Sequence, residues 1–436
     1  MRKYQQLALL LISCFSIGVL LMYKSENNRL KYVLKYVNFF GRSDAAILRR
    51  LEKNATKEDL TLPALSKPLP VFQLIGESFH AYSAFWKRNE LVARGEAHIL
   101  VVGKKGAVVD FRCTLIYDGG ARSVQGKFRF QRDANESIAE DKSTTFTNYN
   151  FYCLVNRDFG KPEYVSLMDT TASLKTQMKL RLRYLKPSNK NTESNLLARL
   201  PATICVDLVT YNMSSNNNNL LQFFLYHQAL GVEHFLVYNY DQLPEKVISV
   251  LERTSMHLYA LPFNFPFVQA NGTVTRIRQL ILTDCLLRNS NYAALTMLLT
   301  PNEFFYPSVR IVGDQSQLSF YRQLRHYTTE ISRFQMATFS VCIDTNRKLL
   351  IDNTHYDPEL KPPHKMFFYR LDQQSSQLLA LTQAQSVELP LSSAFVHRYV
   401  HCQHVGEDGL HDWRNGVRED FMEHINALRN EVDVLI

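Results

Sequence analysis

The chain has 436 residues, of which 46% are hydrophobic, so it is long enough for more than one core and too apolar for a disordered protein. Its formal net charge is +9. Residues 1–68 hold 12 Lys and Arg against 5 Asp and Glu, so most of the positive excess lies in this first stretch. Because a nucleic-acid surface places basic clusters inside a folded domain, the charge pattern argues against nucleic acid as a partner.

The amino terminus carries an apolar run without charges. Residues 7–23 follow two basic residues and precede a third, and 17 helical residues span about 26 Å, the short end of the transmembrane range. A cleavable signal peptide, cut near Ser16 or Gly18, is the alternative interpretation. The run continues past both sites, which favours an uncleaved transmembrane anchor behind a cytosolic tail of residues 1–6. We therefore expect a single-pass type II membrane protein with a luminal body.

Sequons and cysteines agree with a luminal body. Four triplets match the acceptor pattern for N-glycosylation. They begin at Asn54, Asn135, Asn212 and Asn271. Of the seven cysteines, Cys14 lies in the anchor, and the other six would allow three disulfides in an oxidising lumen, with 15 connectivities open. Cys113 and Cys153 fall within predicted strands and are candidates for one bridge; buried free thiols are the alternative.

The luminal part divides by composition and pattern. Residues 24–70 are polar and basic and end in a proline-bearing stretch, which is typical of a stem. Residues 71–185 contain short alternating runs separated by glycine turns, a pattern that predicts a small β-rich domain, a sandwich in our interpretation. A polar linker, residues 186–199, follows.

From residue 200 to 436 strand and helix patterns alternate. A βαβ order of this kind predicts a parallel sheet with right-handed crossovers, so we expect an α/β domain with a mainly parallel, Rossmann-type sheet. Leu295 to Leu299 is a continuous apolar run and predicts a strand buried on both faces. It is followed by the polar residues Thr300 to Glu303. Open α/β sheets bind ligands at the carboxyl ends of such strands.

Three segments in this domain carry a resemblance to a known family. Residues 219–239 read N-L-L-Q-F-F-L-Y-H-Q-A-L-G-V-E-H-F-L-V-Y-N, residues 279–288 read Q-L-I-L-T-D-C-L-L-R, and residues 300–304 read T-P-N-E-F. Together they resemble glycosyltransferase family 92, over roughly residues 205–405. The resemblance implies a Golgi transferase of the GT-A type that moves galactose from UDP-galactose to a glycan with inversion and uses a divalent metal such as Mn²⁺.

The chain departs from the family at its metal motif. The family has Asp-x-Asp followed by Glu, whereas this chain has Thr300, Asn302 and Glu303, which become the candidate metal ligands. A hydroxyl and an amide still offer oxygen, but two negative charges are lost, which weakens binding of hard cations. Gln222 also stands where the family often has an acid. Two interpretations follow: a transferase with a weak or altered metal requirement, or a catalytically impaired descendant that acts as a luminal glycan-binding or scaffolding protein.

Other candidates come from position or from the resemblance. The loop containing Tyr211 and Asn212 follows the first strand of the domain and is placed to meet a nucleotide. Asp284 lies on the helix before the key strand and is a donor-binding candidate alongside a surface or capping role. His397 and Arg398 resemble a His-Tyr-Arg region of the family, where an Arg would stabilise diphosphate charge.

Inversion requires a carboxylate that takes a proton from the acceptor hydroxyl. Three acids are candidates for this base, and their spacing does not choose among them. They are Glu303, Asp344 and Glu388. His227 lies on an apolar helix face, and we interpret it as structural. The chain contains no P-loop, no G-x-S-x-G and no G-x-G-x-x-G motif, which argues against NTPases, serine hydrolases and dinucleotide enzymes. A third interpretation is an extracellular adhesion or structural module.

Overall fold

The computed structural model describes the greater part of the chain after its first 64 residues. The described residues are 65–89, 94–132, 145–157, 159–172, 177–185, 200–211, 217–267, 273–290, 292–311, 320–324, 327, 331–344, 346–371, 386–402 and 410–435. All of them belong to one compact unit, Leu62–Ile436. The predicted tail, anchor and linker, and the four sequons, lie outside the described residues. Within the described part, no helix is long and apolar enough to cross a membrane.

The first sheet contains nine strands in the order β1-β2-β3-β6-β5-β4-β7-β8, with β9 paired to β2. Their bounds are β1 (Gln73–Ile75), β2 (Phe79–Asn89), β3 (Arg94–Lys104), β4 (Phe111–Tyr117), β5 (Arg122–Arg132), β6 (Phe146–Val155), β7 (Tyr164–Asp169), β8 (Gln177–Arg181) and β9 (Arg183–Leu185). Apart from the β2–β9 pair, their pairings are antiparallel.

This sheet is one curled surface, so the prediction of a two-sheet sandwich is wrong. Strand β5 pairs with β4 along its first half and with β6 along its second half, which leaves no break at which two sheets could separate. Strands β1 and β8, at opposite ends of the order, are also in contact. The sheet therefore curls toward closure like a barrel and encloses a single core, to which Phe79, Leu115 and Phe151 belong.

The second sheet contains eleven strands in the order β12-β11-β10-β13-β17-β15-β16-β20, with β14, β18 and β19 joined at its side. Their bounds are β10 (Leu200–Asp207), β11 (His234–Tyr238), β12 (His257–Leu261), β13 (Ala293–Leu299), β14 (Glu303–Pro307), β15 (Arg333–Cys342), β16 (His355–Tyr356), β17 (Met366–Arg370), β18 (Ser386–Glu388), β19 (Ala394–Val400) and β20 (His411–Asp412).

The prediction of a Rossmann-type domain with a mainly parallel sheet is also wrong. Strands β12, β11, β10 and β13 run parallel, but the sheet continues through antiparallel pairs from β13 to β17 and from β17 to β15. Over the two sheets together, antiparallel pairings predominate among the described strands. The cause lies after Leu299, because the regular alternation of strand and long helix ends there and a parallel neighbour generally needs a long crossover.

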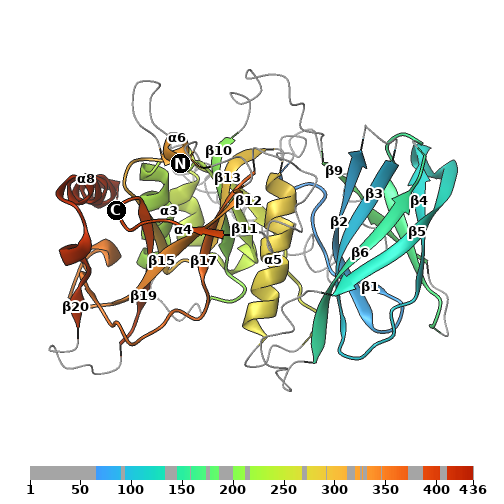
Figure 1. Ribbon diagram of the computed structural model, residues 1–436, viewed down its shortest axis with the longest axis horizontal. Helices are drawn as coiled ribbons and strands as arrows, with labels where there is room; N and C mark the ends of the chain where they lie inside the picture. The colour runs from blue at the N-terminus through green and yellow to red at the C-terminus, as the bar shows by residue number, and fades with distance from the viewer. Residues whose placement is uncertain are drawn as a thin grey trace, which may run out of the picture. The chain divides into compact units, whose positions relative to one another are not determined.

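Helices cover both faces of the parallel strands (Figure 1). Helices α3 (Asn217–Ala229) and α4 (Glu245–Leu251) lie on one face and α5 (Val274–Asn289) lies on the other. The short α6 (Phe320–Gln323) and α8 (Glu419–Leu435) contribute to the same core as α3. Alternate residues of β10 divide between two cores: Ile204 packs in the core that contains α3 and α8, and Cys205 packs in the core that contains α5. Helix α5 lies between the second sheet and strands of the first sheet, which explains why it is buried nearly all round.

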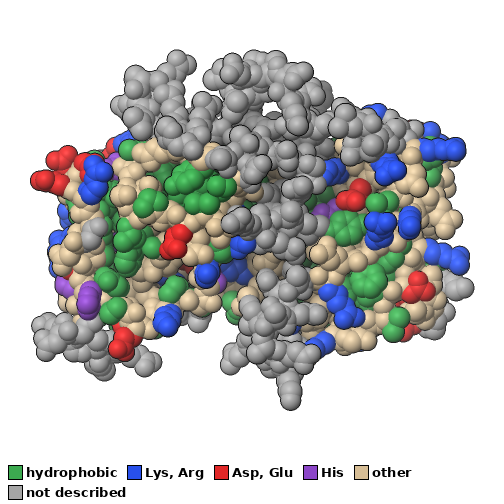
Figure 2. Space-filling view, viewed as in Figure 1, with side chains coloured by type: hydrophobic (Ala, Val, Ile, Leu, Met, Phe, Trp, Pro, Cys, Tyr) green, Lys and Arg blue, Asp and Glu red, His purple; other side chains and the backbone are tan. Residues whose placement is uncertain are grey.

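Two helices follow their sequence signals closely. Helix α3 is followed by Gly231 at φ +90°, where the Gly231 N–H donates to Gln228 O and the Val232 N–H donates to His227 O, a glycine-ended helix stop. In α8 the apolar residues Phe421, Ile425 and Leu428 recur at helical spacing and are buried against the core. On the face shown in Figure 2, Lys and Arg side chains are dispersed over the described surface and do not form one continuous patch.

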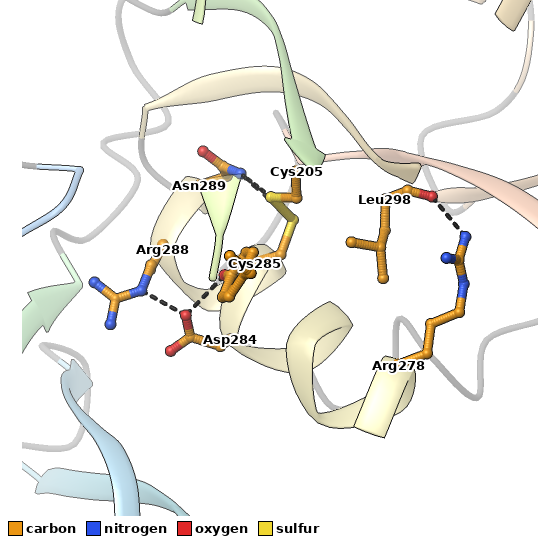
Figure 3. The surroundings of a disulfide bond; sticks show 8 residues. Cys205, Arg278, Asp284, Cys285, Arg288, Asn289 and Leu298 are labelled. Atoms are coloured by element: carbon orange, nitrogen blue, oxygen red, sulfur yellow. Dashed lines mark hydrogen bonds and ion pairs between the residues drawn. A yellow bond between two sulfur atoms is a disulfide. The ribbon is translucent and has the colours of Figure 1, made fainter. Parts of the chain in front are cut away.

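Three disulfides join the described cysteines, as predicted from the six cysteines outside the expected anchor. They are Cys113–Cys153, Cys205–Cys285 and Cys342–Cys402. The first is the bridge expected within the β-rich domain, and it links β4 to β6. The second ties α5 to β10 (Figure 3), and the third joins the end of β15 to the residues after β19. The alternative of free thiols at these six positions is excluded.

Candidate functional site

The candidate site lies where two neighbouring parallel strands, β10 and β13, end side by side. Strand β10 ends at Asp207 and β13 ends at Leu299, and the register pairs Val206 with Leu299. Asp207 and Thr300 therefore leave adjacent strands at the same edge of the sheet. This edge, the carboxyl end of parallel strands, is where open α/β sheets bind ligands.

A tight turn brings Glu303 back to this edge. The Glu303 N–H donates to the Thr300 carbonyl at 2.9 Å, and Pro and Asn occupy the two central positions, where a turn favours them. Inside the turn the Thr300 hydroxyl donates to Asn302 Oδ1 at 2.8 Å, and Asn302 Nδ2 donates to Tyr399 O at 3.0 Å. Residues Thr300 to Glu303 thus form a turn with internal hydrogen bonds, which we call the corner, and a further hydrogen bond joins it to β19.

Arg278 of α5 connects the two strand ends. Its Nη2 donates to Glu303 Oε2 at 3.0 Å and to the Leu298 carbonyl at 3.0 Å. Its Nη1 lies 3.5 Å from Asp207 Oδ2. Both carboxylates are buried, with Glu303 1% and Asp207 0% exposed. One guanidinium therefore holds two buried acids at the sheet edge.

Glu303 remains ionised in this environment. Burial on its own would raise its pKa, but Arg278, His364 and the Thr300 N–H together hold the pKa of this carboxyl well below its usual range. His364 Nε2 lies 2.9 Å from Glu303 Oε1, and the Thr300 N–H donates to Oε2 at 2.8 Å. Both oxygens of Glu303 are thus already engaged by protein donors.

Arg398 lies directly opposite Glu303. The two residues pair across the antiparallel strands β14 and β19, so their side chains share one face. Burial lowers the pKa of Arg398, Glu303 raises it, and the neighbouring charge of Arg278 lowers it. Within the described residues, no carboxylate forms an ion pair with this guanidinium. Arg398 is therefore a half-buried cation that can accept an external anion.

The candidate ligands Thr300, Asn302 and Glu303 do not form a site that fits a divalent metal. The Thr300 hydroxyl and the Asn302 amide oxygen bond to each other, and Glu303 is bonded to Arg278. No group of three or more His, Cys, Asp or Glu suited to a metal ion occurs in the described part of the chain. A hard cation requires several oxygens with free lone pairs, and here a guanidinium already takes them.

The other donor-binding candidates do not all lie together with Arg398. Tyr211 is half-buried in the segment that follows β10 and packs against the core, and Asn212 lies outside the described residues. His397 points to the opposite face of β19 from Arg398 and is fully buried among aromatic rings, 4.2 Å from the Tyr306 ring centre. Burial lowers the pKa of His397 to about 3, so it stays neutral within the core.

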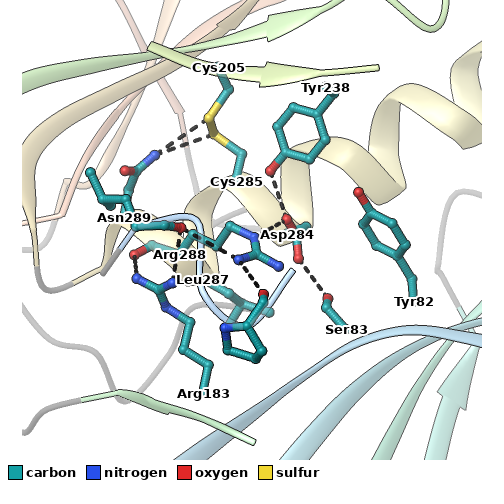
Figure 4. Close-up of polar contacts among 12 residues, drawn as sticks. Tyr82, Ser83, Arg183, Cys205, Tyr238, Asp284, Cys285, Leu287, Arg288 and Asn289 are labelled. Atoms are coloured by element: carbon teal, nitrogen blue, oxygen red, sulfur yellow. Dashed lines mark hydrogen bonds and ion pairs between the residues drawn. A yellow bond between two sulfur atoms is a disulfide. The ribbon is translucent and has the colours of Figure 1, made fainter. Parts of the chain in front are cut away.

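Asp284 lies on another side of α5 from Arg278. Its Oδ2 accepts from Arg288 Nε at 2.5 Å and from the Tyr238 hydroxyl at 2.8 Å, and its Oδ1 accepts from Ser83 (Figure 4). Figure 3 shows Arg278 beside Leu298, with Asp284 and Arg288 on the far side of the helix. The structure therefore places Asp284 in the contact between α5 and the first sheet.

The two other candidate bases lie away from Glu303. In the β14–β19–β15 register, Glu303, Arg398 and Ser340 form one row. Glu388 pairs with Gln335, five residues from Ser340, which is about 16 Å along a strand. Asp344 lies four residues beyond Ser340 at the other end and forms an exposed pair with Arg347. The structure thus does not bring the three acids together.

Gln222 and His227, both on α3, form structural hydrogen bonds. Gln222 Oε1 accepts from the Leu350 N–H at 2.6 Å and so anchors the segment after Lys348. His227 Nδ1 pairs with the Phe223 carbonyl, and its Nε2 accepts from the Phe305 N–H at 3.3 Å. Burial lowers the pKa of His227 to about 3, in agreement with its structural interpretation.

Sequence reasoning missed three residues of this site: Asp207, Arg278 and His364. Asp207 had a usable signal, since it is an acid at the carboxyl end of a predicted strand. Arg278 lies within a helix whose polar residues show no clear face, and His364 lies in a loop after two prolines. Neither position carries a local pattern that points to Glu303.

Comparison with known proteins identifies the family. The sequence model of glycosyltransferase family 92 matches residues 201–420, just over half of the chain, and this range includes every residue of the site. None of the curated proteins matches the chain.

Two matching solved structures are crystal structures of HddC from Yersinia pseudotuberculosis, one of them complexed with GMP-PN. They have 9% and 10% identity to this chain and TM-scores of 0.21, and each match covers 52% of this chain and 98% of the other. Similarity at that TM-score carries no argument about this chain. The family model matches more than half of the chain, so the chain belongs to glycosyltransferase family 92.

Proposed function

We propose that this glycosyltransferase moves a hexose, galactose first among the candidates, from a UDP-sugar to a glycan acceptor with inversion. We place it in the Golgi membrane as a single-pass type II protein with a luminal catalytic domain. The observation that carries the proposal is the guanidinium of Arg398, which has no ion-pair partner among the described residues and lies beside the Arg278–Glu303 pair at the carboxyl edge of β10 and β13.

The charge of this edge suits a nucleoside diphosphate. Asp207 and Glu303 are both occupied by Arg278, so Arg398 contributes positive charge that no described carboxylate balances by contact. A diphosphate supplies oxygens in the planar spacing that a guanidinium binds through two N–H groups. Transfer of the sugar increases the negative charge on the diphosphate, and a fixed cation next to it stabilises that charge.

In this proposal Glu303 is a positioning residue. Its two oxygens hold Arg278, His364 and the Thr300 N–H, which leaves it poorly placed to take a proton from an acceptor. The turn that carries Glu303 also fixes Asn302 against Tyr399, the neighbour of Arg398 on β19. The corner thus sets the position of the cation that meets the donor.

The same observation leaves room for a second function. A family member with no base beside its donor site would bind a UDP-sugar or a glycan without transferring it. The two functions differ in turnover, so binding and transfer must be measured on the same preparation.

The test uses the full-length chain, purified in detergent with its glycans and disulfides. Calorimetry with UDP and UDP-galactose measures binding, and release of UDP in the presence of a glycan array measures transfer. We expect UDP to bind, and Arg398→Gln to weaken binding about tenfold or more, as loss of a charge-assisted contact requires. The matched control is Arg418→Gln, which removes an exposed Arg paired with Asp420 and should bind UDP like the wild type.

Three results are decisive. Binding with UDP release establishes the transferase. Binding without release on any acceptor establishes the binding protein. Failure of UDP and UDP-galactose to bind, with the circular-dichroism spectrum of a folded protein, overturns the donor-site proposal.

A further inference from the structure

Arg278 is held between two buried carboxylates at the position where a metal-dependent site would need open oxygens. Its Nη1 lies 3.5 Å from Asp207 Oδ2, and its Nη2 lies 3.0 Å from Glu303 Oε2. The two amino groups of one guanidinium thus bridge acids from two strands. An arginine held in this way is fixed by contacts on both sides.

The other acceptor positions of these acids are also taken. Asp207 Oδ1 accepts from the N–H groups of Val209 and Thr210, and its Oδ2 accepts from the Thr210 hydroxyl at 2.6 Å. Glu303 Oε1 is bonded to His364. An incoming cation would have to break several hydrogen bonds and approach a positive side chain at contact distance, where like charges repel strongly.

We infer that this enzyme holds the diphosphate of its donor with Arg398 and without a divalent cation, because Arg278 fills the place between the two carboxylates. The inference rests on the proposed function, and it names how the same site neutralises its ligand. Arg278 acts as a positioning residue: it cancels the charge of Asp207 and Glu303, so that the edge does not repel a phosphate and Arg398 can bind one.

Loss of the two motif aspartates fits this arrangement. With Thr300 and Asn302 in their places, the edge keeps two acids, and a single arginine contacts both of them. Affinity for hard cations rises with the number of charged ligands, so a site with its remaining carboxylates neutralised has little affinity left. The metal requirement expected from the family is thereby replaced by side-chain charge.

The first measurement uses Mn²⁺ alone, with no nucleotide. The electron paramagnetic resonance signal of free Mn²⁺ reports binding to the full-length chain in detergent. We expect no saturable binding at this site. Calorimetry with UDP should then give dissociation constants that agree within about twofold in Mn²⁺ and in chelator, since a twofold change is small against tenfold steps in affinity.

The second measurement uses Arg278→Gln, which removes the bridging charge and leaves Asp207 and Glu303 facing each other with His364 nearby. We expect this variant to gain Mn²⁺ binding and to bind UDP more tightly in Mn²⁺ than in chelator. The matched control is Arg276→Gln, which removes a neighbouring α5 arginine that has no described contact with either acid and should behave like the wild type.

The outcomes separate this inference from the proposed function. Saturable Mn²⁺ binding by the wild type that is lost in Glu303→Gln overturns the inference, whatever UDP does. A tenfold or greater loss of UDP affinity in chelator overturns it as well. Absence of UDP binding in every condition overturns the proposed function, and the Mn²⁺ titration of the wild type still tests the charge arrangement, even if Arg278→Gln does not fold.

Discussion

Ser83 of β2 donates a hydrogen bond of 2.6 Å to Asp284 Oδ1 of α5, across a sequence separation of 201 residues. The same carboxylate accepts from Arg288 and Tyr238 (Figure 4). Arg288 and Arg183 also donate to the backbone carbonyl of Leu65. A buried polar cluster therefore joins the first sheet to the helix that carries Arg278. This contact makes the first sheet part of the support of the site.

We expect Asp284→Asn to destabilise the whole unit. The substitution leaves Arg288, which is 1% exposed, without its counter-charge, and breaking a buried ion pair costs about 3–5 kcal/mol. Ser83→Ala removes one neutral donor to the same carboxylate and should cost about 1–2 kcal/mol. Urea unfolding followed by fluorescence measures both.

The control for this pair is Asp118→Asn, which breaks an exposed pair with Arg122. It should change the free energy of unfolding by less than about 0.5 kcal/mol. If Asp284→Asn unfolded like this control, the buried cluster would not stabilise the joined unit.

Gly126 should not tolerate a side chain while the first disulfide is present. Strand β5 passes between β4 and β6, so the Cys113–Cys153 bridge crosses it at Gly126. A Cβ at this residue would lie 2.3 Å from Cys153 Sγ and 3.0 Å from Cys113 Sγ. We expect Gly126→Ala to cost about 1–3 kcal/mol by overpacking and to leave free thiols, which mass spectrometry after alkylation detects.

The disulfide is the stated cause of this clash, and a double-mutant cycle tests it. In a Cys113→Ala, Cys153→Ala background the sulfur atoms are gone, and the added cost of Gly126→Ala should fall. An equal cost with and without the bridge would show that the Leu154 carbonyl, 3.2 Å from the same position, causes the effect instead.

The free energy of unfolding should fall as the pH drops from about 6.5 to 4. Burial lowers the pKa of His98 to about 4, against a smaller opposite effect of its bond to Asn150. In the unfolded chain His98 binds a proton at higher pH than in the folded chain. The contribution of His98 to the free energy of unfolding is therefore complete above pH 6.5 and is lost as the pH approaches 4. For His98 alone the loss reaches about 3 kcal/mol.

Urea unfolding at pH 7.5, 5.5 and 4.5 measures this dependence. His98→Gln keeps a donor for Asn150 but does not titrate, so its stability should vary less with pH than that of the wild type. His355→Gln, at an exposed position, should leave the dependence unchanged. A wild-type curve that is flat from pH 7.5 to 4.5 would contradict the prediction. The Glu303 carboxylate adds to the loss only below about pH 4.5, because its pKa is held low by Arg278.

Asn302→Ala should loosen the corner that positions Arg398. The variant loses the bond from Nδ2 to Tyr399 O and the acceptor of the Thr300 hydroxyl, which costs about 1–2 kcal/mol. UDP affinity should fall with it, because the backbone next to Arg398 is less constrained. Calorimetry and urea unfolding check the two effects, with the exposed Asn346→Ala as control. An unchanged UDP affinity at reduced stability would remove the positioning role of the corner.

Several features of this protein are local, and the sequence alone predicts them. The run Leu295 to Leu299 is a buried strand because continuous apolar residues need cover on both faces. Gly231 marks the end of α3 because a left-handed residue there favours glycine. The six cysteines outside the expected anchor predict three bridges, and the structure has three. The family match also follows from spaced sequence segments, and it confirms the resemblance.

The predictions that were wrong concern features that depend on contacts between residues distant in the sequence. Strand direction after Leu299, and the closure of the first sheet, are set by pairings such as β13 with β17 and β5 with both β4 and β6, which no local period encodes. Asp284 and Arg278 lie six residues apart on one helix. Their side chains nevertheless reach different surroundings, because a helix turns by about 100° per residue.

The site itself follows the same division. The resemblance to the family implies that Thr300, Asn302 and Glu303 occupy the position of its metal motif, with Thr and Asn in place of two aspartates. Folding adds Asp207, Arg278 and His364 from three other elements, and their contacts turn Glu303 into the partner of an arginine. The sequence specifies the type of each residue, but the charges around that residue depend on which neighbours the packed structure brings within a few ångströms of it.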